Sequence, residues 1–273
     1  MADRILVAEI GRHATSERML IQVDGREEKL KGDCLSREGI EEALEDGRQY
    51  NTEGLDTAFI PSRRGRAVQT AEYVKKGIKQ RHPDAVIPIL EPRAELDSIG
   101  YKLPQKAQVN PELNSYHAMI RYLAEHPEEL ATIMNAPAGI AKVILEQLQS
   151  LPSQGSTETE LHLRRLFSHG PVTGVFPLAL GNKDLVEAVK EEGDYFGKSE
   201  GGNDPTGMIP NSMNIEQSES GLLKVTYFFR GITPGFDINP DTLTQLARSY
   251  DPSKVCTEDR SITGQIAKIR AKR

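Results

Sequence analysis

Residues 5–16 read ILVAEI followed by GRHATS, a mostly apolar run and then a polar segment. A short apolar run that stops at a glycine is typical of a buried strand, so Arg12 and His13 are expected at the carboxyl end of that strand. Ligands of open α/β sheets bind at the carboxyl ends of the strands. The stretch therefore predicts a ligand site at one edge of a sheet, with a guanidinium and an imidazole in it.

The rest of the sequence alternates segments typical of helices and strands. Helices are predicted over residues 36–46, 65–79, 112–150 and 240–250, and strands over residues 57–60, 85–90, 209–215 and 222–229. Pro88 predicts an edge position for its strand because proline cannot donate to a neighbouring strand. This alternation predicts an α/β layered fold.

One predicted strand departs from the apolar pattern of a central parallel strand. Residues 161–168 read LHLRRLFS and contain His162, Arg164 and Arg165. A central parallel strand is normally apolar along its whole length. We therefore expect the buried part of this strand to be short.

Three further blocks follow GRHATS along the chain: LSREGIEEA (residues 35–43), SRRGRAVQTAE (residues 62–72) and LFSHG (residues 166–170). In this order the four blocks resemble the motifs of the histidine phosphatase superfamily, which also contains the cofactor-dependent phosphoglycerate mutases. The resemblance covers roughly the first hundred residues and then about 161–235. It leaves residues 102–160 without a match.

The resemblance implies a fold and a set of site residues. The fold is a three-layer α/β/α sandwich with a mostly parallel central sheet, in one domain over residues 1–273 with a helical insertion at about 102–160. Such an insertion commonly forms a cap over the phosphate pocket in the family. The alternative is a helical hairpin that only covers the sheet. The family's catalytic arginine corresponds to Arg66, and its second histidine corresponds to His169.

Physical chemistry assigns roles to these side chains independently. Phosphoryl transfer relies on positioning and on electrostatic stabilisation of three charged oxygens, for which planar guanidinium groups are suited. The neutral ring of His13 is expected to attack phosphorus, with a hydrogen bond from its other nitrogen to a backbone carbonyl fixing the tautomer. His169 is expected to act as a further catalytic donor to the phosphoryl oxygens. The predicted phosphate-binding residues are Arg12, Ser16, Arg66 and His169.

The leaving oxygen of a phosphate ester needs a proton donor near neutral pH. Three acids lie in the segment LEPRAELDSIG (residues 90–100), which resembles the acid-bearing loop of the family: Glu91, Glu95 and Asp97. Glu95 fits the family spacing best, although it stands one residue further from Gly100 than in the phosphoglycerate mutases. We therefore predict Glu95 as the catalytic acid and keep Glu91 and Asp97 as alternatives.

Composition restricts the class of protein. The formal net charge of −6 argues against a nucleic-acid or anionic-membrane partner for the chain as a whole. The sequence contains two cysteines, too few for a disulfide framework and without metal-ligand spacing. No secretory signal or membrane span is recognised. We expect a cytoplasmic protein that uses no metal ion and no cofactor.

The predicted function is a metal-independent phosphomonoester hydrolase of the histidine acid type with a phosphohistidine intermediate on His13. Its substrate is expected to be a small-molecule phosphomonoester or a phosphoprotein, selected by the insertion and by a long loop over residues 197–211. One alternative is a phosphoglycerate-mutase-like phosphotransferase, which Met19 and the absence of tryptophan disfavour. The other is a catalytically silent phospho-ligand-binding protein, whose acids would point away from the pocket. The sequence leaves the oligomeric state open.

Overall fold

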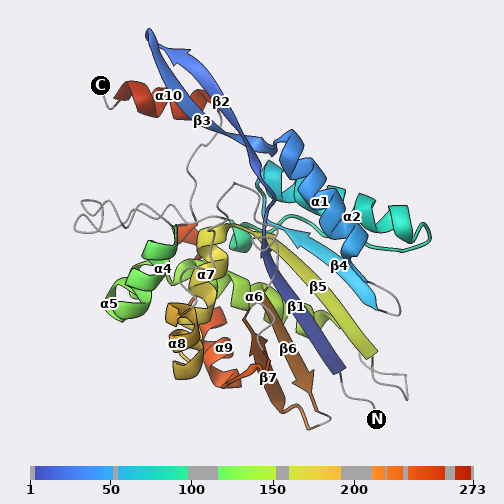
Figure 1. Cartoon of the computed structure of the whole chain (residues 1–273). Helices are drawn as coiled ribbons and strands as arrows, with labels where there is room; N and C mark the ends of the chain where they lie inside the picture. Colours follow the sequence, from blue (N-terminus) through green and yellow to red (C-terminus); the bar gives the residue numbers. More distant parts are fainter. Residues whose placement is uncertain are drawn as a thin grey trace.

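The computed structural model describes residues 4–51, 55–97, 116–151, 160–191, 211–218, 220–229, 233–255 and 262–271. A six-stranded sheet forms its centre (Figure 1). The strands are, in spatial order, β4 (Asp56–Pro61), β5 (Glu160–Ser168), β1 (Arg4–Arg12), β6 (Asn211–Gln217), β7 (Leu223–Phe228) and β8 (Phe236–Ile238).

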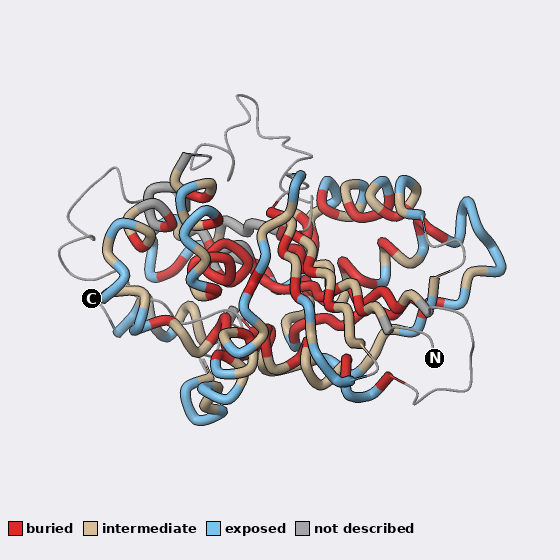
Figure 2. The backbone as a smooth tube through the Cα atoms, turned by 90° about the horizontal axis from the view of Figure 1, so that it is seen from below, coloured by how far each residue is buried: buried red, intermediate tan, exposed pale blue. Residues whose placement is uncertain are grey.

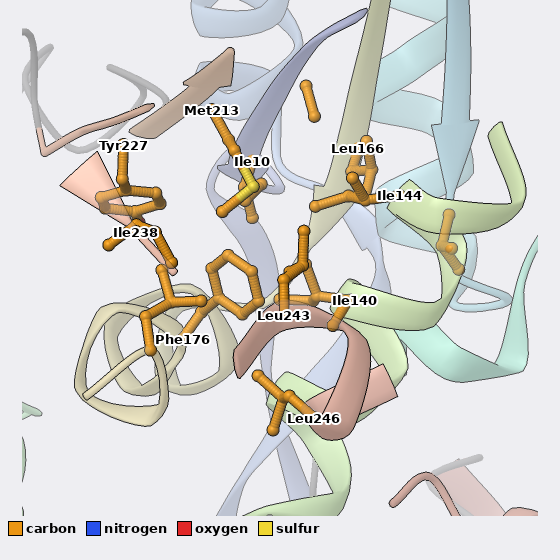
Figure 3. Packing of buried hydrophobic residues seen from close by; sticks show 14 of the residues in the cluster. Ile10, Ile140, Ile144, Leu166, Phe176, Met213, Tyr227, Ile238, Leu243 and Leu246 are labelled. Atoms are coloured by element: carbon orange, nitrogen blue, oxygen red, sulfur yellow. The ribbon is translucent and has the colours of Figure 1, made fainter. Parts of the chain in front are cut away.

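Helices cover both faces of this sheet, which confirms the predicted α/β sandwich (Figures 1 and 2). On one face α1 (Arg37–Gln49) and α2 (Gly65–Arg81) enclose a core that contains Phe59 and Phe167. On the other face α6 (Asn135–Ser150), α7 (Gly170–Ala179) and α9 (Pro240–Arg248) enclose a larger core. Figure 3 shows this second core, with Phe176 lying among side chains from the sheet and from two helices.

The sheet is mixed, so its parallel share is smaller than expected. β4, β5 and β1 are parallel neighbours, whereas β1 with β6, β6 with β7 and β7 with β8 are antiparallel. The antiparallel half follows from the hairpin that the sequence predicts over residues 209–229. Residues 85–90 lie beside β4 through an isolated bridge from Ile89 to Phe59, which agrees with the edge position predicted from Pro88.

A second sheet, which the sequence analysis missed, consists of β2 (Ser16–Val23) and β3 (Arg26–Leu35). This hairpin extends away from the main sheet and lies beside α10 (Ile262–Ala271) (Figure 1). Asp24 and Gly25 form its turn with φ values of 50° and 79°. A two-residue hairpin turn needs positive φ at both positions, and Asp-Gly between alternating apolar residues is the usual sequence signal for it.

The predicted insertion contributes helices to the body of the fold. Its described part contains α4 (Tyr116–Glu125), α5 (Pro127–Leu130), a 3-10 turn η3 (Ala131–Ile133) and α6. Ile140 and Ile144 of α6 are buried in the same core as Leu166 of β5 (Figure 3). For α6 this burial favours a helix that covers the sheet over a cap above the phosphate pocket. Residues 102–115 and 152–159 of the insertion, and the loop predicted over 197–211 except for Asn211, lie outside the described residues.

The remaining elements are a 3-10 turn η1 (Ala94–Leu96), α8 (Lys183–Glu191) and a 3-10 turn η5 (Pro252–Lys254). Of the helices that the structure describes, none is both long and apolar enough to span a lipid bilayer. The described residues also contain no cluster of three or more His, Cys, Asp or Glu side chains that could hold a metal ion.

The expectation of a short buried part in β5 is wrong. His162, Arg164 and Arg165 are 4%, 9% and 1% exposed, and the strand pairs with β1 along its full length. Carboxylates balance these side chains. Asp56 Oδ2 lies 2.7 Å from His162 Nδ1 and 2.9 Å from Arg164 Nη2, and Asp46 Oδ2 lies 2.7 Å from Arg165 Nη2. Buried charges are tolerated when they are paired, so ion pairing explains how a basic segment forms a central strand.

Candidate active site

The two predicted catalytic histidines lie together at one end of the sheet. β1 and β5 are parallel with Arg12 opposite Ser168, and the backbone N–H of His13 donates to the carbonyl oxygen of Ser168 over 3.0 Å. Each histidine follows its strand directly, so this register brings both rings to the same edge. The ring centroids are 5.1 Å apart, with an angle of 66° between the planes. One tetrahedral anion can contact both rings at this separation.

The backbone fixes the ring of His13. Its Nδ1 lies 2.6 Å from the carbonyl oxygen of Ala14. A carbonyl oxygen only accepts hydrogen bonds, so Nδ1 must carry the hydrogen. In the neutral ring the lone pair is then on Nε2, which is the form that a nucleophile needs. His13 is half-buried, so its ring also has access to solvent.

His169 is buried and contacts two residues from the end of β4 and the start of α2. Its Nε2 lies 3.1 Å from Ser62 Oγ, and its Nδ1 lies 3.4 Å from Arg66 Nη2. A guanidinium group only donates, so Nδ1 accepts and Nε2 donates to Ser62 in the neutral ring. Ser62 directly follows β4, and Arg66 lies in the first turn of α2. The carboxyl ends of three parallel strands therefore supply the site.

The loop after His13 is tied to α2. The backbone N–H of Ala14 donates to Thr70 Oγ1 over 3.1 Å, and the Thr70 hydroxyl donates to the carbonyl oxygen of Arg66 over 2.7 Å. Ala14, Arg66 and Thr70 are all buried. The sequence blocks GRHATS and RAVQTA, which are separated by about fifty residues, are thus joined in space by one threonine hydroxyl.

The other two predicted phosphate-binding residues flank this loop. Arg12 is the last residue of β1 and its side chain is exposed. Ser16 is the first residue of β2 and is 8% exposed. Their contacts with phosphate stay predictions, as do the phosphate contacts of Arg66 and His169.

The contacts of Glu95 oppose its predicted role as a proton donor. Glu95 lies in η1, and its carboxylate accepts hydrogen bonds from Arg93 Nε and Nη2 over 3.1 and 2.9 Å and from Lys142 Nζ over 2.9 Å. Burial disfavours its ionisation, but the hydrogen bonds from Arg93 and Lys142 outweigh burial and lower the pKa of Glu95 to about 2. A carboxylate with this pKa holds no proton to donate near neutral pH.

The two alternative acids, Asp97 and Glu91, lie on either side of Glu95 in the sequence and have different surroundings. Asp97 is buried and accepts hydrogen bonds from the backbone N–H, Nε and Nη2 of Arg63 over 2.9, 2.9 and 2.7 Å. It therefore anchors the segment after β4 that carries Ser62. Glu91 is exposed on the segment before η1. None of these described contacts joins Glu91 or Asp97 to His13 or His169.

The sequence analysis missed one acidic residue that does contact the loop after His13. Glu42 of α1 accepts hydrogen bonds from the backbone N–H and the hydroxyl of Thr15 over 2.9 and 2.8 Å. Glu42 belongs to the block LSREGIEEA, in which Ser36, Gly39 and Glu42 have helical spacing and share one face. From this spacing the sequence could have predicted that α1 packs against the loop after His13 through these three positions.

Comparisons with known proteins bear on the fold. No protein-family model and no curated protein matches the sequence. A solved structure described as mycobacterial hydrolase 2 is similar with a TM-score of 0.51 and 14% identity, over 91% of this chain and 98% of the other. A mycobacterial glucosyl-3-phosphoglycerate phosphatase has a TM-score of 0.44 and 15% identity, over 82% of this chain and 98% of the other.

A third similar structure is a phosphoglycerate mutase from Plasmodium falciparum, with a TM-score of 0.31 and 12% identity, over 84% of this chain and 92% of the other. The similarity to the mycobacterial hydrolase, together with the six-stranded sheet between two helical layers, confirms the α/β sandwich predicted from the motifs. In this fold two imidazoles follow the ends of neighbouring strands, and a guanidinium from the first turn of α2 lies beside one of them.

Proposed function

We propose that this chain is a phosphomonoester hydrolase in which His13 is the nucleophile. The observation that carries the proposal is the pairing of His13 and His169 at 5.1 Å, with Arg66 Nη2 beside the second ring. Guanidinium and imidazole groups gathered at strand ends suit a dianionic phosphoryl group. The site would take a small-molecule phosphomonoester or a phosphoprotein.

In the first step Nε2 of His13 attacks phosphorus in line with the ester oxygen. The Nε2–P bond forms as the P–O bond breaks, and the leaving oxygen takes a proton from solvent water. The contact between Nδ1 and the Ala14 carbonyl, 2.6 Å long, supports this step because it directs the lone pair to Nε2 and favours the positive charge that develops on the ring. Arg12 and Arg66 would hold the equatorial oxygens.

In the second step water attacks phosphorus and the Nε2–P bond breaks, which returns the lone pair to Nε2. The water oxygen leaves as part of inorganic phosphate, and the two protons of the water stay on that phosphate or pass to solvent. His169 would donate to a phosphoryl oxygen through Nδ1 in its protonated form, because its Nε2 faces Ser62 Oγ at 3.1 Å. Arg66 would then turn from Nδ1 of His169 to the phosphate.

The experiment is a steady-state assay on a panel of phosphomonoesters with and without a chelator, for the parent and for His13→Ala. A histidine nucleophile predicts hydrolysis that the chelator does not change, and a loss of at least about 10³-fold for His13→Ala, as for other nucleophile deletions. An exposed histidine, His82, supplies the matched control His82→Ala, which should retain parent turnover. Full activity of His13→Ala would refute the mechanism.

A second experiment addresses the proton on the leaving oxygen. If Glu95 stays ionised, Glu95→Gln should lower kcat/KM by the same factor for alkyl and for p-nitrophenyl phosphates, because neither reaction uses its proton. A loss confined to alkyl phosphates would instead restore Glu95 as the acid. That outcome would require Glu95 to leave Arg93 and Lys142 when substrate binds.

The contacts of the acids favour one second candidate, a phospho-ligand-binding protein without turnover. Glu95 and Asp97 pair with Arg93 and Arg63, and Glu91 is exposed, which matches the arrangement expected for that alternative. The two candidates differ in product. A binding protein would take up phosphomonoesters in a calorimetric titration and release no phosphate over many hours.

A further inference from the structure

Helix α1 holds Thr15 from one side through three positions at helical spacing. The backbone N–H of Ser36 donates to the carbonyl oxygen of Thr15 over 3.0 Å. The Gly39 backbone comes so close that a Cβ there would lie 2.0 Å from the same oxygen. One turn later Glu42 accepts from the N–H and the hydroxyl of Thr15 over 2.9 and 2.8 Å. Residue 15 is therefore fixed to the rigid frame of the helix.

The contact of Glu42 and the contact of His13 are made by the same peptide group. The N–H of Thr15 and the carbonyl group of Ala14 belong to one planar trans peptide and point in opposite directions. Glu42 Oε2 binds the N–H end over 2.9 Å, and His13 Nδ1 donates to the carbonyl end over 2.6 Å. The carboxylate of Glu42 and the imidazole of His13 are thus linked by hydrogen bonds to the two ends of one rigid peptide group.

We propose that Glu42 is a positioning residue for the phosphatase reaction, because through the peptide between Ala14 and Thr15 it holds His13 with the hydrogen on Nδ1 and the lone pair on Nε2. The proposal rests on His13 being the nucleophile. Glu42 makes no described contact with either imidazole ring. It acts on the nucleophile only by orienting and polarising the intervening peptide.

The negative charge of Glu42 matters beyond its shape. A carboxylate at the N–H end of a peptide strengthens the hydrogen bond that the carbonyl end accepts, because hydrogen bonds in a chain polarise one another. The Ala14 carbonyl then binds the Nδ1 hydrogen more firmly, both in the neutral ring and in the positively charged phosphohistidine. Glutamine has the same shape and can still accept from the Thr15 N–H, but it lacks the charge.

The test measures the tautomer of His13 directly. The parent, Glu42→Gln and Glu42→Ala would be labelled with 15N at histidine, and the His13 ring signals assigned by their loss in His13→Gln. In the parent at a pH where the ring is neutral, the hydrogen should reside on Nδ1. In Glu42→Ala the signals should move toward the Nε2–H form, which free histidine favours in water.

Kinetics supply the second readout. We expect kcat to fall about tenfold in Glu42→Gln and about 10²-fold in Glu42→Ala, in line with the cost of removing supporting groups or misplacing a reacting atom. KM should stay within about twofold because the phosphate contacts are untouched. Glu41→Gln is the matched control, because Glu41 is the exposed neighbour on the same helix.

A further variant, Thr15→Val, separates the two contacts of Glu42. Valine removes the hydroxyl and keeps the N–H, so its loss of kcat should be smaller than that of Glu42→Ala. Thermal unfolding of every variant confirms that α1 is intact.

A parent-like tautomer in Glu42→Ala would overturn the proposal, whatever happens to kcat, because a merely structural role would leave the ring unchanged. That result would leave the phosphatase function standing. If the parent instead hydrolysed no phosphomonoester, the proposed function would fail, and the NMR measurement would still report whether Glu42 controls the ring of His13.

Discussion

The middle of β5 and its carboxyl end both bury basic side chains, but with different partners. In the middle, Arg165 is 1% exposed and lies 2.7 Å from the carboxylate of Asp46. Its guanidinium also lies 4.8 Å from the ring of Tyr50 and 5.2 Å from the ring of Phe167. At the end, His169 is 2% exposed, and its described partners are a second imidazole, a guanidinium and a hydroxyl.

The difference shows that residue type alone does not mark a site. A buried basic side chain whose charge is matched by a nearby carboxylate contributes to the fold, because each group compensates the charge of the other. Imidazoles and a guanidinium that contact one another at one edge of the sheet offer several hydrogen-bond donors to an incoming anion. Along the chain the change from one arrangement to the other occurs within four residues, from Arg165 in β5 to His169 directly after it.

The comparison predicts a large loss of stability when a pair in the middle is broken. Arg165→Met leaves the half-buried Asp46 without its cation, and Glu9 loses an ion pair of 3.9 Å. We expect the free energy of unfolding to fall by about 3–5 kcal/mol, while kcat/KM per folded molecule stays unchanged. Urea unfolding and assays of the folded fraction measure the two effects.

A double variant controls this result. Arg165→Met combined with Asp46→Leu removes both charges and should recover part of the lost stability, because replacing a buried ion pair by apolar side chains is often neutral. If Arg165→Met lowered kcat/KM and left the free energy of unfolding unchanged, it would be wrong to assign Arg165 to stability and His169 to catalysis.

At the strand end the expected effect moves from stability to catalysis. Arg66→Met removes the guanidinium that would hold the phosphoryl oxygens, so kcat/KM should fall by about 10²–10³-fold, the usual cost of losing a transition-state donor. Arg81→Met is the matched control, since Arg81 lies at the exposed far end of the same helix and should have no effect on kcat/KM. Equal losses in both variants would point to a role of α2 as a whole.

Glu95 sharpens the comparison because it is a paired carboxylate beside the site. Its pKa is lowered from 4.5 to about 2. Its ion pairs therefore contribute their full stabilisation at pH values above the ordinary pKa of a glutamate, and this stabilisation is lost as the pH falls from about 4.5 toward 2. The stability difference between the parent and Glu95→Gln should be largest above pH 5 and shrink at pH 3. Urea unfolding across this pH range measures it, with exposed Glu91→Gln as control. A difference that is independent of pH would exclude these ion pairs.

The sequence predicted the part of the site that follows from strand order. His13 and His169 each come directly after a strand, and parallel neighbours place such residues at one edge, so their meeting required only that β1 and β5 pair. The mostly apolar runs before Arg12 and Ser62 likewise indicated strands that end at these two residues. The α/β sandwich followed from the alternation of segments.

What the sequence did not reveal depends on partners from distant elements. Glu95 has the family position of an acid, but Lys142, 47 residues away on α6, binds its carboxylate. Glu42 contacts Thr15 because α1 packs close to the loop after His13. Arg165 is compatible with a central strand only because Asp46 of α1 lies opposite. Each case needs a side-chain contact between elements that local periodicity does not report.

The hairpin of β2 and β3 is a different case, because its signal was present. Asp24-Gly25 is a dipeptide typical of a two-residue hairpin turn, and the structure has positive φ at both positions. The predicted elements include none between GRHATS and LSREGIEEA, the segment that forms this hairpin. Turn chemistry alone would have predicted it.

The most direct measurement is to quench the protein during turnover of a phosphomonoester labelled in its phosphoryl group, and to locate the trapped group by peptide mapping and NMR. The account predicts one acid-labile phosphohistidine, at His13, with phosphorus on Nε2, because Nδ1 donates to the Ala14 carbonyl over 2.6 Å. A phosphoryl group on another residue, on Nδ1 of His13, or on no residue during measurable hydrolysis would contradict it.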